Sequence, residues 1–435
     1  MFKIPELKRR VIFTFLLMAV YRVGCSIPVP GIDGAKIAEY FEQKASGSIL
    51  GLYSMFSGGA LAKGSVFALG IMPYISASII LQLLTVVWPY LERLSKEGES
   101  GRRKITQYTR YGTVVLSFFQ GFMIAYALLN GMLGPDIVPS YEGFQRLQFV
   151  LMTTMTLTAG TAFIMWLGEQ ISELGIGNGI SLIIFGGIVA RLPMAIGGIF
   201  QGLKDNQLKP FSVIIIAAFM LVVVGVIIYV ERAQRRIPIQ HAKRVVGRRV
   251  YGGASTHLPL KVNTAGVIPP IFASSILVFP STIASFISTD KHQWLQAVVD
   301  VMQPGRFLWD SIYVVLIIFF CYFYTAVTFN PVDVAENLKK SGAYIPGFRP
   351  GKRTADYIDR VLTRITFIGA IYVSAVCVMP SVLITQFKVP FSFGGTALLI
   401  VIGVGLDTIQ QIESHMIMRH YDGFLGAKGK FKGRR

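Results

Sequence analysis

Few side chains in the apolar stretches of this chain have a type and position suited to chemistry. Asp407 is the only carboxylate deep in an apolar run, and an intramembrane carboxylate can carry a proton or a coupling ion. A paired or helix-packing carboxylate is the more common alternative, and we favour it. Arg22 lies near enough to the end of its apolar stretch for its guanidinium group to snorkel to water.

Sequence motifs of enzymes and metal sites are missing. The five histidines lie in loops or at the ends of apolar stretches, with no H-E-x-x-H pair among them. The chain contains no G-x-S-x-G turn, no phosphate-binding loop and no C-x-x-C pair. Cys25, Cys321 and Cys377 have no paired spacing and are expected to be reduced, structural thiols. We therefore expect no enzyme, no metal and no cofactor.

The composition instead indicates a membrane protein with several spans. Of 435 residues, 53% are hydrophobic and 15% are charged, which is too apolar for one soluble core. Stretches of about 20 apolar residues can cross roughly 30 Å of hydrocarbon. Ten such stretches lie near residues 10–30, 66–88, 107–130, 146–169, 176–199, 210–231, 263–288, 308–329, 362–381 and 393–416.

The distribution of positive charge predicts the orientation of these ten helices. With the N-terminus inside, most of the 42 Lys and Arg residues fall in cytoplasmic segments. Both termini are then cytoplasmic. The same bias produces much of the net charge of +19, so the charge alone is weak support for a nucleic-acid partner.

Two of the predicted helices share a sequence pattern. "GIMPYISASII" (residues 70–80) aligns without gaps to "GVIPPIFASSI" (residues 266–276), with six identical positions of eleven. Because five spans separate the two helices, they would cross the membrane in opposite directions, as in proteins built from two inverted halves. The frequency of small residues and proline in membrane helices is the alternative explanation.

A half-length apolar segment precedes the second span. Residues 49–64, "ILGLYSMFSGGALAKG", are too short and too polar to cross a bilayer. Irregular backbone at membrane depth occurs only where protein or a water-filled cavity surrounds it. We expect a short re-entrant segment there; an amphipathic turn on the outer surface is the alternative.

The largest polar segments are two loops predicted to be cytoplasmic, residues 231–261 and 330–360. Each mixes cations with Gly and Pro turn signals and is long enough for a hairpin or a short helix. Such loops can simply set topology. Their length and the apolar residues at their tips favour a docking surface for a large partner, in which Arg248, Arg249 and Arg349 would contact phosphate or carboxylate groups.

Several long motifs of this chain, in this order, resemble the SecY family of bacteria, the pore subunits of the Sec protein translocase. The motifs are "MFSGGALAKGSVFALGIMPYISASII", "KEGESGRRKITQYTRYGT", "WLGEQISELGIGNGIS", "STHLPLKVNTAGVIPPIFASSI" and "NPVDVAENLKKSGAYIPGFRPG". The resemblance covers nearly the whole chain. It implies an all-α protein of ten transmembrane helices in two inverted halves of five, with a short re-entrant plug helix before the second span.

The resemblance also implies how the chain is divided. Residues 1–200 would form the N-terminal half, with helices 1–5 and the plug at about 49–64. The C-terminal half would begin with helix 6 at 201–232. It would continue with a cytoplasmic loop (233–262), helices 7 and 8 (263–330), a second loop (331–361), helices 9 and 10 (362–417) and a basic cytoplasmic tail (418–435).

Family membership further implies a ring of aliphatic side chains that closes the waist of the pore. By motif match its members are Ile71, Ile75, Ile180, Ile184, Ile271 and Ile400. Two i, i+4 pairs among them place branched side chains on one helix face, which suits a constriction that excludes water. Spacing alone fits ordinary core or lipid-facing isoleucines equally well, so the assignment depends on the resemblance.

The plug and a lateral gate are assigned in the same way. Plug residues that can pack against the ring are Leu50, Leu52, Met55, Phe56 and Leu61, and those that let the backbone bend are Gly58, Gly59 and Gly64. Helices 2, 3, 7 and 8 would line a seam that opens to lipid. The candidate gate residues are Ser76, Gln82, Asn263 and Phe279. Ordinary interhelical hydrogen bonding is the alternative role of Gln82 and Asn263.

The function implied is a passive, gated channel in the bacterial plasma membrane. It would translocate unfolded polypeptides and release signal sequences and membrane segments laterally into the lipid bilayer. The membrane partners would be SecE and SecG, and the SecA motor ATPase or the ribosome would dock on the loops. The energy would come from such a partner or from the membrane potential. The docking residues would be Arg235, Arg236, Lys243, Arg244, Arg248, Arg249, Lys339, Lys340 and Arg349. A small-solute transporter that uses Asp407 is the competing class, and a membrane scaffold is a third.

Overall fold

The computed structural model describes most of the chain. The described residues are 5–43, 49–131, 137–139, 141–205, 210–241, 244–246, 249–251, 255–286, 306–387 and 395–426.

Each of the ten predicted spans corresponds to a helix, as the resemblance implied. In chain order they are α1 (Pro5–Gly24), α4 (Met72–Val87), α6 (Glu99–Leu129), α7 (Phe144–Leu174), α8 (Gly179–Val189) with α9 (Leu192–Lys204), α10 (Pro210–Arg232), α11 (Ile268–Phe286), α13 (Phe307–Thr328), α15 (Lys352–Phe387) and α16 (Gly395–Gly426). Among the described residues, seven helical segments are long and apolar enough to cross a membrane, and the bent pair α4–α5 makes eight. The apolar part of α11 is shorter, and α1 carries charges in its first turns.

Several helices are longer than the apolar stretches that predicted them. α6, α7, α15 and α16 continue beyond these stretches into more polar residues. The fifth span is interrupted at Ala190 and Arg191, and α9 restarts with Pro193 in its first turn, where a missing N–H is tolerated.

The internal sequence repeat has a structural counterpart. Gly70 and Gly266 both adopt positive φ, 57° and 65°, and a helix begins two residues after each. Pro73 and Pro269 then occupy the first turn of α4 and α11. Positive φ favours glycine, so the shared glycine has the same local function in both places. α4 and α11 also contact each other.

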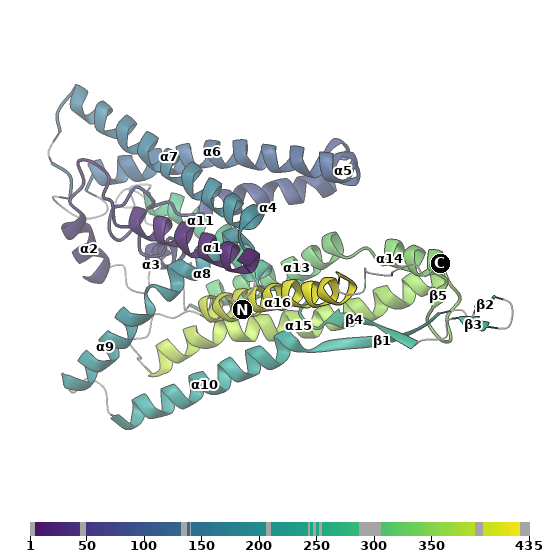
Figure 1. The fold of residues 1–435 in the computed structure, drawn as a ribbon. Helices are drawn as coiled ribbons and strands as arrows, with labels where there is room; N and C mark the ends of the chain where they lie inside the picture. The colour runs from purple at the N-terminus through teal and green to yellow at the C-terminus, as the bar shows by residue number, and fades with distance from the viewer. Residues whose placement is uncertain are drawn as a thin grey trace.

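The transmembrane helices form two groups that meet along a common core (Figure 1). The N-terminal group holds α1, α4, α6, α7 and α8, and the C-terminal group holds α10, α13, α15 and α16. α11 contacts both groups, through α4 and α6 on one side and α13 and α15 on the other. One buried hydrophobic cluster runs through both halves.

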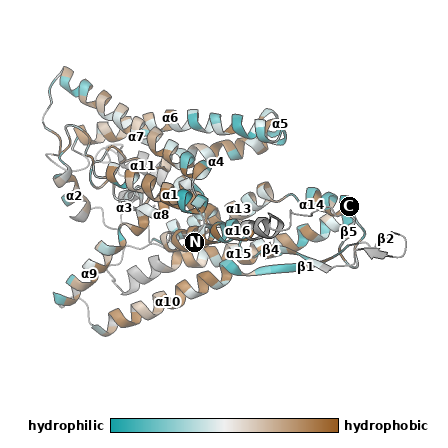
Figure 2. Ribbon diagram, viewed as in Figure 1, coloured by the Kyte–Doolittle hydropathy of each residue, from teal (hydrophilic) through white to brown (hydrophobic). Residues whose placement is uncertain are grey.

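Polar segments gather at one end of the molecule (Figure 2). α5 (Pro89–Lys96) bends 99° from α4. The first long loop forms the antiparallel hairpin of β1 (Gln234–His241) and β4 (Ser255–Lys261), with β2 (Arg244–Val246) paired to β3 (Arg249–Tyr251) in between. The second loop forms α14 (Pro331–Lys340) and β5 (Ala343–Tyr344).

The two long loops are one structural unit. β5 adds to the free edge of β1, which gives the sheet order β4-β1-β5. Beneath the sheet lies a small core of Ile237, Leu260, Ile345 and Ile358, which joins both loops to the first turns of α15. The sequence predicted a hairpin or short helix in each loop, but it did not predict that the loops pair.

Candidate functional site

The six isoleucines assigned to the ring come from four elements of both halves. Ile71 and Ile75 lie at the start of α4, Ile180 and Ile184 on α8, Ile271 on α11, and Ile400 on α16. Five of them are at most 5% exposed and belong to the central hydrophobic cluster, and the half-buried Ile180 packs against it. The fold therefore brings residues up to 329 positions apart into one apolar core between the halves.

The segment predicted to be re-entrant is helical in its first half and forms turns in its second half. α3 (Ile49–Phe56) has only eight residues and contacts α8 and α11, which supply three of the six isoleucines. Turns follow as far as the start of α4, so the plug helix is short, as the resemblance implied. We call residues 49–64 the plug segment. Phe56 and Leu61 are buried in it, whereas the side chains of Leu50, Leu52 and Met55 lie outside the described structure.

Side chains of α1 hold the plug segment by its backbone. The Tyr21 hydroxyl donates to the Ser57 carbonyl (3.3 Å), and Arg22 Nη1 donates to the Gly58 carbonyl (3.0 Å). The Tyr53 hydroxyl of the segment donates to the carbonyl of Leu69, which precedes α4 (3.2 Å). Arg22 thus turns toward the plug segment, which differs from the snorkelling geometry predicted for it.

Gly58, Gly59 and Gly64 of the plug segment all adopt positive φ, but their surroundings differ. A Cβ atom on Gly58 would lie 2.9 Å from Gly187 Cα of α8, and one on Gly64 would lie 3.0 Å from Ile32 and Ile37 side-chain atoms. A Cβ on Gly59 would meet nothing within 4 Å. Gly59 is therefore needed only for its backbone conformation, whereas Gly58 also permits close packing on α8.

α4 and α11 form a contact that we call the seam, and α11 also touches α6 there. Ser76 and Gln82 are half-buried on α4, and Gln82 Nε2 donates to Ser78 of its own helix (3.4 Å). The Gln82 Oε1 atom is buried and has no hydrogen-bond partner within the described structure. Asn263 Nδ2 donates to Glu231 Oε1 (2.7 Å) in its own half of the protein. Phe279 lies on α11, and its side chain is outside the described part.

A second contact between the halves joins α8 to α16, and we call it the back contact. The loop before α8 presents the Gly177 N–H, which donates to Gln411 Oε1 of α16 (2.8 Å). α1 holds the same loop, because Arg10 Nη1 donates to the Gly175 carbonyl and Thr14 Oγ1 accepts from the Ile176 N–H. Sequence reasoning missed these contacts, since no local pattern links α1, this loop and α16.

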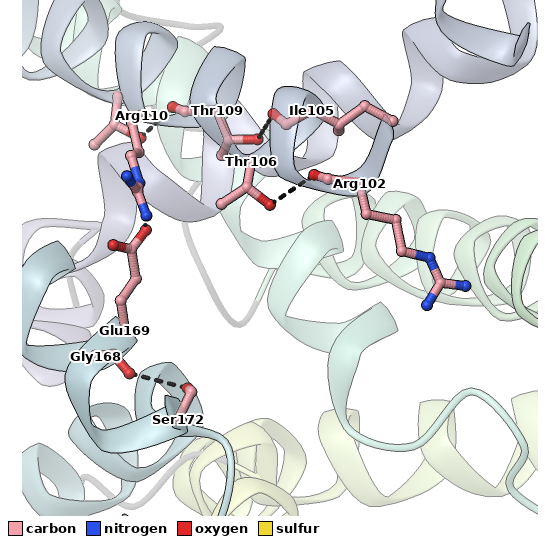
Figure 3. Close-up of polar contacts among 9 residues, drawn as sticks. Arg102, Ile105, Thr106, Thr109, Arg110, Gly168, Glu169 and Ser172 are labelled. Carbon is pink, nitrogen blue, oxygen red and sulfur yellow. Dashed lines mark hydrogen bonds and ion pairs between the residues drawn. The ribbon is translucent and has the colours of Figure 1, made fainter. Parts of the chain in front are cut away.

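An ion pair between α6 and α7 was also not predicted. Arg110 Nε lies 2.8 Å from Glu169 Oε1, and the two side chains point toward each other across the helix pair (Figure 3). The Glu169 side chain is only 16% exposed, so the pair is partly shielded from water. Both residues stand in motifs quoted above, but 59 positions of separation give no signal of pairing.

Asp407 is paired, as favoured from the sequence. Its Oδ1 atom lies 3.9 Å from Lys261 Nζ, and the two side chains are 66% and 53% exposed. An exposed, loosely paired carboxylate does not have the enclosed geometry of an ion-coupling site. Within the described residues, no group of three or more His, Cys, Asp or Glu side chains could hold a metal ion. The three cysteines are buried and unpaired.

The predicted docking cations that are described lie on the joined loops. Arg235 and Arg236 are exposed on β1, Lys339 and Lys340 end α14, and Arg349 follows β5. Lys340 also approaches Glu336 at 3.9 Å. Arg244 and Arg249 begin β2 and β3, with side chains outside the described structure, and Lys243 and Arg248 lie outside it altogether. The pairing of β5 with β1 therefore brings cations of both loops onto one unit.

Known proteins share both the sequence and the fold of this chain. SecY from Escherichia coli K12, a protein translocase subunit, is 52% identical over 431 residues, covering 98% of this chain and 96% of its own. SecY from Thermotoga maritima is 48% identical, covering 100% of this chain and 98% of its own.

Solved structures agree in fold at much lower identity. A protein conducting channel superposes with a TM-score of 0.65 at 16% identity, covering 94% of this chain and 93% of its own. Sec61 in the canine ribosome–channel complex superposes with a TM-score of 0.60 at 14% identity, with the same coverage. The sequence model of the SecY family matches residues 65–409, and the chain therefore belongs to the SecY family.

Proposed function

We propose that this chain is the pore subunit of a protein translocase, a passive channel through which unfolded polypeptides cross the membrane. The observation that carries this proposal is that six isoleucines from both halves belong to one buried cluster, with the plug segment against two of the contributing helices. Its relatives are named as translocase subunits.

The isoleucines would seal the resting channel by dewetting. A ring of branched aliphatic side chains leaves no polar group to hold water or an ion at the constriction. Packing between such side chains is non-directional, so they can yield to a passing chain without losing specific bonds. The plug segment would add a second barrier that its contacts with α1 hold in place.

The seam would be the lateral exit for signal sequences and membrane segments. Ser76, Gln82, Asn263 and Phe279 would tune its opening. An apolar segment of about 20 residues gains free energy by moving from an aqueous pore into lipid, at roughly 25 cal/mol for each Å² of apolar surface removed from water. The driving force for release would thus come from the substrate itself.

Translocation would be driven by partners. We propose that SecE and SecG complete the membrane complex, and that the SecA motor or the ribosome docks on the joined loops. A Sec61 channel has been solved in a complex with the ribosome. By its family, the chain would lie in the bacterial plasma membrane. By the charge distribution, both termini and the joined loops would face the cytoplasm. We propose the same division of the chain into two halves, two cytoplasmic loops and a basic tail as the family resemblance implied.

The test of the channel function is import into proteoliposomes. Vesicles that contain the purified complex should take up a signal-bearing precursor when SecA and ATP are added. A complex that binds SecA but imports no precursor would reduce the chain to a scaffold.

The test of the ring is ion leakage. Replacing Ile75 and Ile271 by glycine should raise the resting conductance of the reconstituted complex. Ile276→Gly on the same helix is the control, because Ile276 is 36% exposed and lies outside the ring. Equal conductance of the wild type, the variant with glycine at Ile75 and Ile271, and the Ile276→Gly control would contradict the ring assignment.

The docking surface can be tested by charge reversal. Arg349→Glu should slow SecA-driven import while the membrane level of the complex stays unchanged. Lys204→Glu is the control, since Lys204 is an exposed cation on α9, at the opposite end of the molecule from the joined loops (Figure 1). Import at the same rate in both variants would contradict the role of Arg349.

A further inference from the structure

Two arginines flank the contact between the plug segment and α8. Arg22 of α1 donates to the Gly58 carbonyl at 3.0 Å. Gly58 packs so closely on Gly187 that a Cβ atom added to it would lie 2.9 Å from Gly187 Cα. Arg191 follows Gly187 by four residues, and the αR backbone of Ala190 and Arg191 places it one helical turn further on.

These two cations have no carboxylate partner in the described part of the chain. Neither takes part in any of the five ion pairs found there. Both are half-buried, and both lie beside the contact of Gly58 with Gly187. Lys63, an exposed cation, belongs to the same plug segment. The region between α1, the plug segment and the end of α8 therefore carries three cations.

Like charges brought together and partly removed from water raise the energy of the resting channel unless an anion joins them. Guanidinium groups suit this ligand, because their planar N–H forks match a carboxylate. Arg22 uses one N–H donor for the Gly58 carbonyl, and its other N–H donors can bind an anion.

We propose that Arg22 and Arg191 form an anion-binding site beside the plug segment, and that it takes carboxylates of the translocating polypeptide or a small free anion such as chloride. A carboxylate that engages Arg22 competes with the Gly58 carbonyl for the guanidinium group. Acidic stretches of a substrate thus weaken the hold of α1 on the plug segment, whereas basic stretches are repelled. For the passing chain, this inference rests on the channel function proposed above.

The experiment compares three precursors that differ only in a short cluster of glutamate, glutamine or lysine within the mature region. Import is measured in proteoliposomes with SecA and ATP. For the wild-type complex we expect the glutamate precursor to enter faster than the lysine precursor by about threefold or more, as electrostatic attraction of this kind permits. Arg191→Gln should bring this ratio close to one.

Lys204→Gln is the matched control, because it removes an exposed cation from α9, 13 residues further along the chain. The control should keep the wild-type ratio. An unchanged ratio in Arg191→Gln overturns the proposal, and so does an equal loss in Lys204→Gln, which would indicate only the general field of the protein. The glutamine precursor reports separately on the channel function, since its failure to enter wild-type vesicles would concern that function alone.

Two further arms identify the source of the anion. Replacing chloride by gluconate at constant ionic strength should widen the wild-type ratio if free chloride competes for the site, and should leave it unchanged if substrate carboxylates are the only ligands. Vesicles with and without anionic lipid test a different ligand class. A ratio that exists only with anionic lipid would overturn the proposal in favour of a lipid site.

Discussion

Two of the contacts between the halves of this protein, the seam and the back contact, are built differently. At the seam, no hydrogen bond between described side chains joins α4 to α11: Gln82 bonds within its own helix, and Asn263 bonds within its own half. At the back contact, Gln411 of α16 accepts a hydrogen bond from Gly177 at the start of α8. Apolar packing is non-directional, whereas a hydrogen bond fixes distance and angle. Among the described side chains, apolar packing therefore holds the seam, whereas a directional bond supports the back contact.

Glycines show the same contrast. Gly177 at the back contact has φ 88°, and a Cβ atom there would lie 2.9 Å from Leu182 and 3.3 Å from Thr408 of α16. Gly266 beside the seam has φ 65°, and a Cβ atom would meet nothing within 4 Å. Both glycines have the same backbone requirement, but only the one at the back contact is also tightly packed.

The largest effect is therefore expected from Gly177→Ala, with Gly266→Ala as its control. Both variants lose about 1–2 kcal/mol of unfolding free energy, because an L-residue is strained at positive φ. Gly177→Ala should lose roughly a further 1–3 kcal/mol from overpacking against Leu182 and α16. Thermal unfolding of the two purified variants measures the difference. Equal midpoints would mean that the back contact is no tighter than the seam.

At the seam, Gln82→Leu should raise the free energy of unfolding instead of lowering it. The Gln82 Oε1 atom is buried without a partner in the described structure, and leucine removes that unsatisfied group at similar volume. The closed channel should gain about 1–2 kcal/mol, which slows the release of signal sequences into lipid. Crosslinking of a signal sequence to lipid over time measures that release. Ser78→Ala is the control, since it removes only the weak 3.4 Å partner of Gln82. Faster release in Gln82→Leu would contradict a seam held by apolar packing.

Gln411→Leu tests the directional bond of the back contact. It removes the acceptor of the Gly177 N–H, and the expected loss is about 0.5–1.5 kcal/mol because the site is partly open to water. Gln410→Leu on the same helix is the control, because its Oε1 atom accepts only a long bond from Lys261 (3.4 Å). If the unfolding midpoints fall equally in both variants, the bond from Gly177 to Gln411 stabilises the protein no more than the long Lys261–Gln410 bond does.

The sequence predicted the elements of this contrast but not the contrast itself. Apolar stretch lengths predicted ten helices, and the repeat of Gly70 and Gly266 predicted that α4 and α11 are related, because these are local patterns with fixed periods. Gln411 and Gly177 are 234 positions apart, and their bond depends on how two helices from different halves pack. The same holds for Arg22, whose type suggested snorkelling but whose neighbour in space is the plug segment.

The plug segment shows which features the family resemblance predicts and which remain predictions. Gly58, Gly59 and Gly64, which are expected to let the backbone bend, all adopt positive φ. α3 ends at Phe56, just before Gly58 and Gly59, which agrees with the short plug helix that the resemblance implied. Whether this segment moves aside, and whether the six isoleucines form a ring, are still predictions, since burial in one closed core is common to a seal and to ordinary packing.

The smallest effect is expected from Asp407→Asn, which breaks a polar contact inside one half. The 3.9 Å pair with Lys261 is more than half exposed on both sides, and water and salt screen such pairs. The loss of unfolding free energy should stay below about 0.5 kcal/mol, and import of a precursor should continue at a rate close to that of the wild type. Lys261→Met, which removes the other partner, should behave in the same way. A large loss of stability or import in Asp407→Asn, but not in Lys261→Met, would mean that this carboxylate has a role beyond its pair with Lys261. Polar contacts within a half would then matter as much as the bond between the halves, and the distinction between seam and back contact would lose its basis.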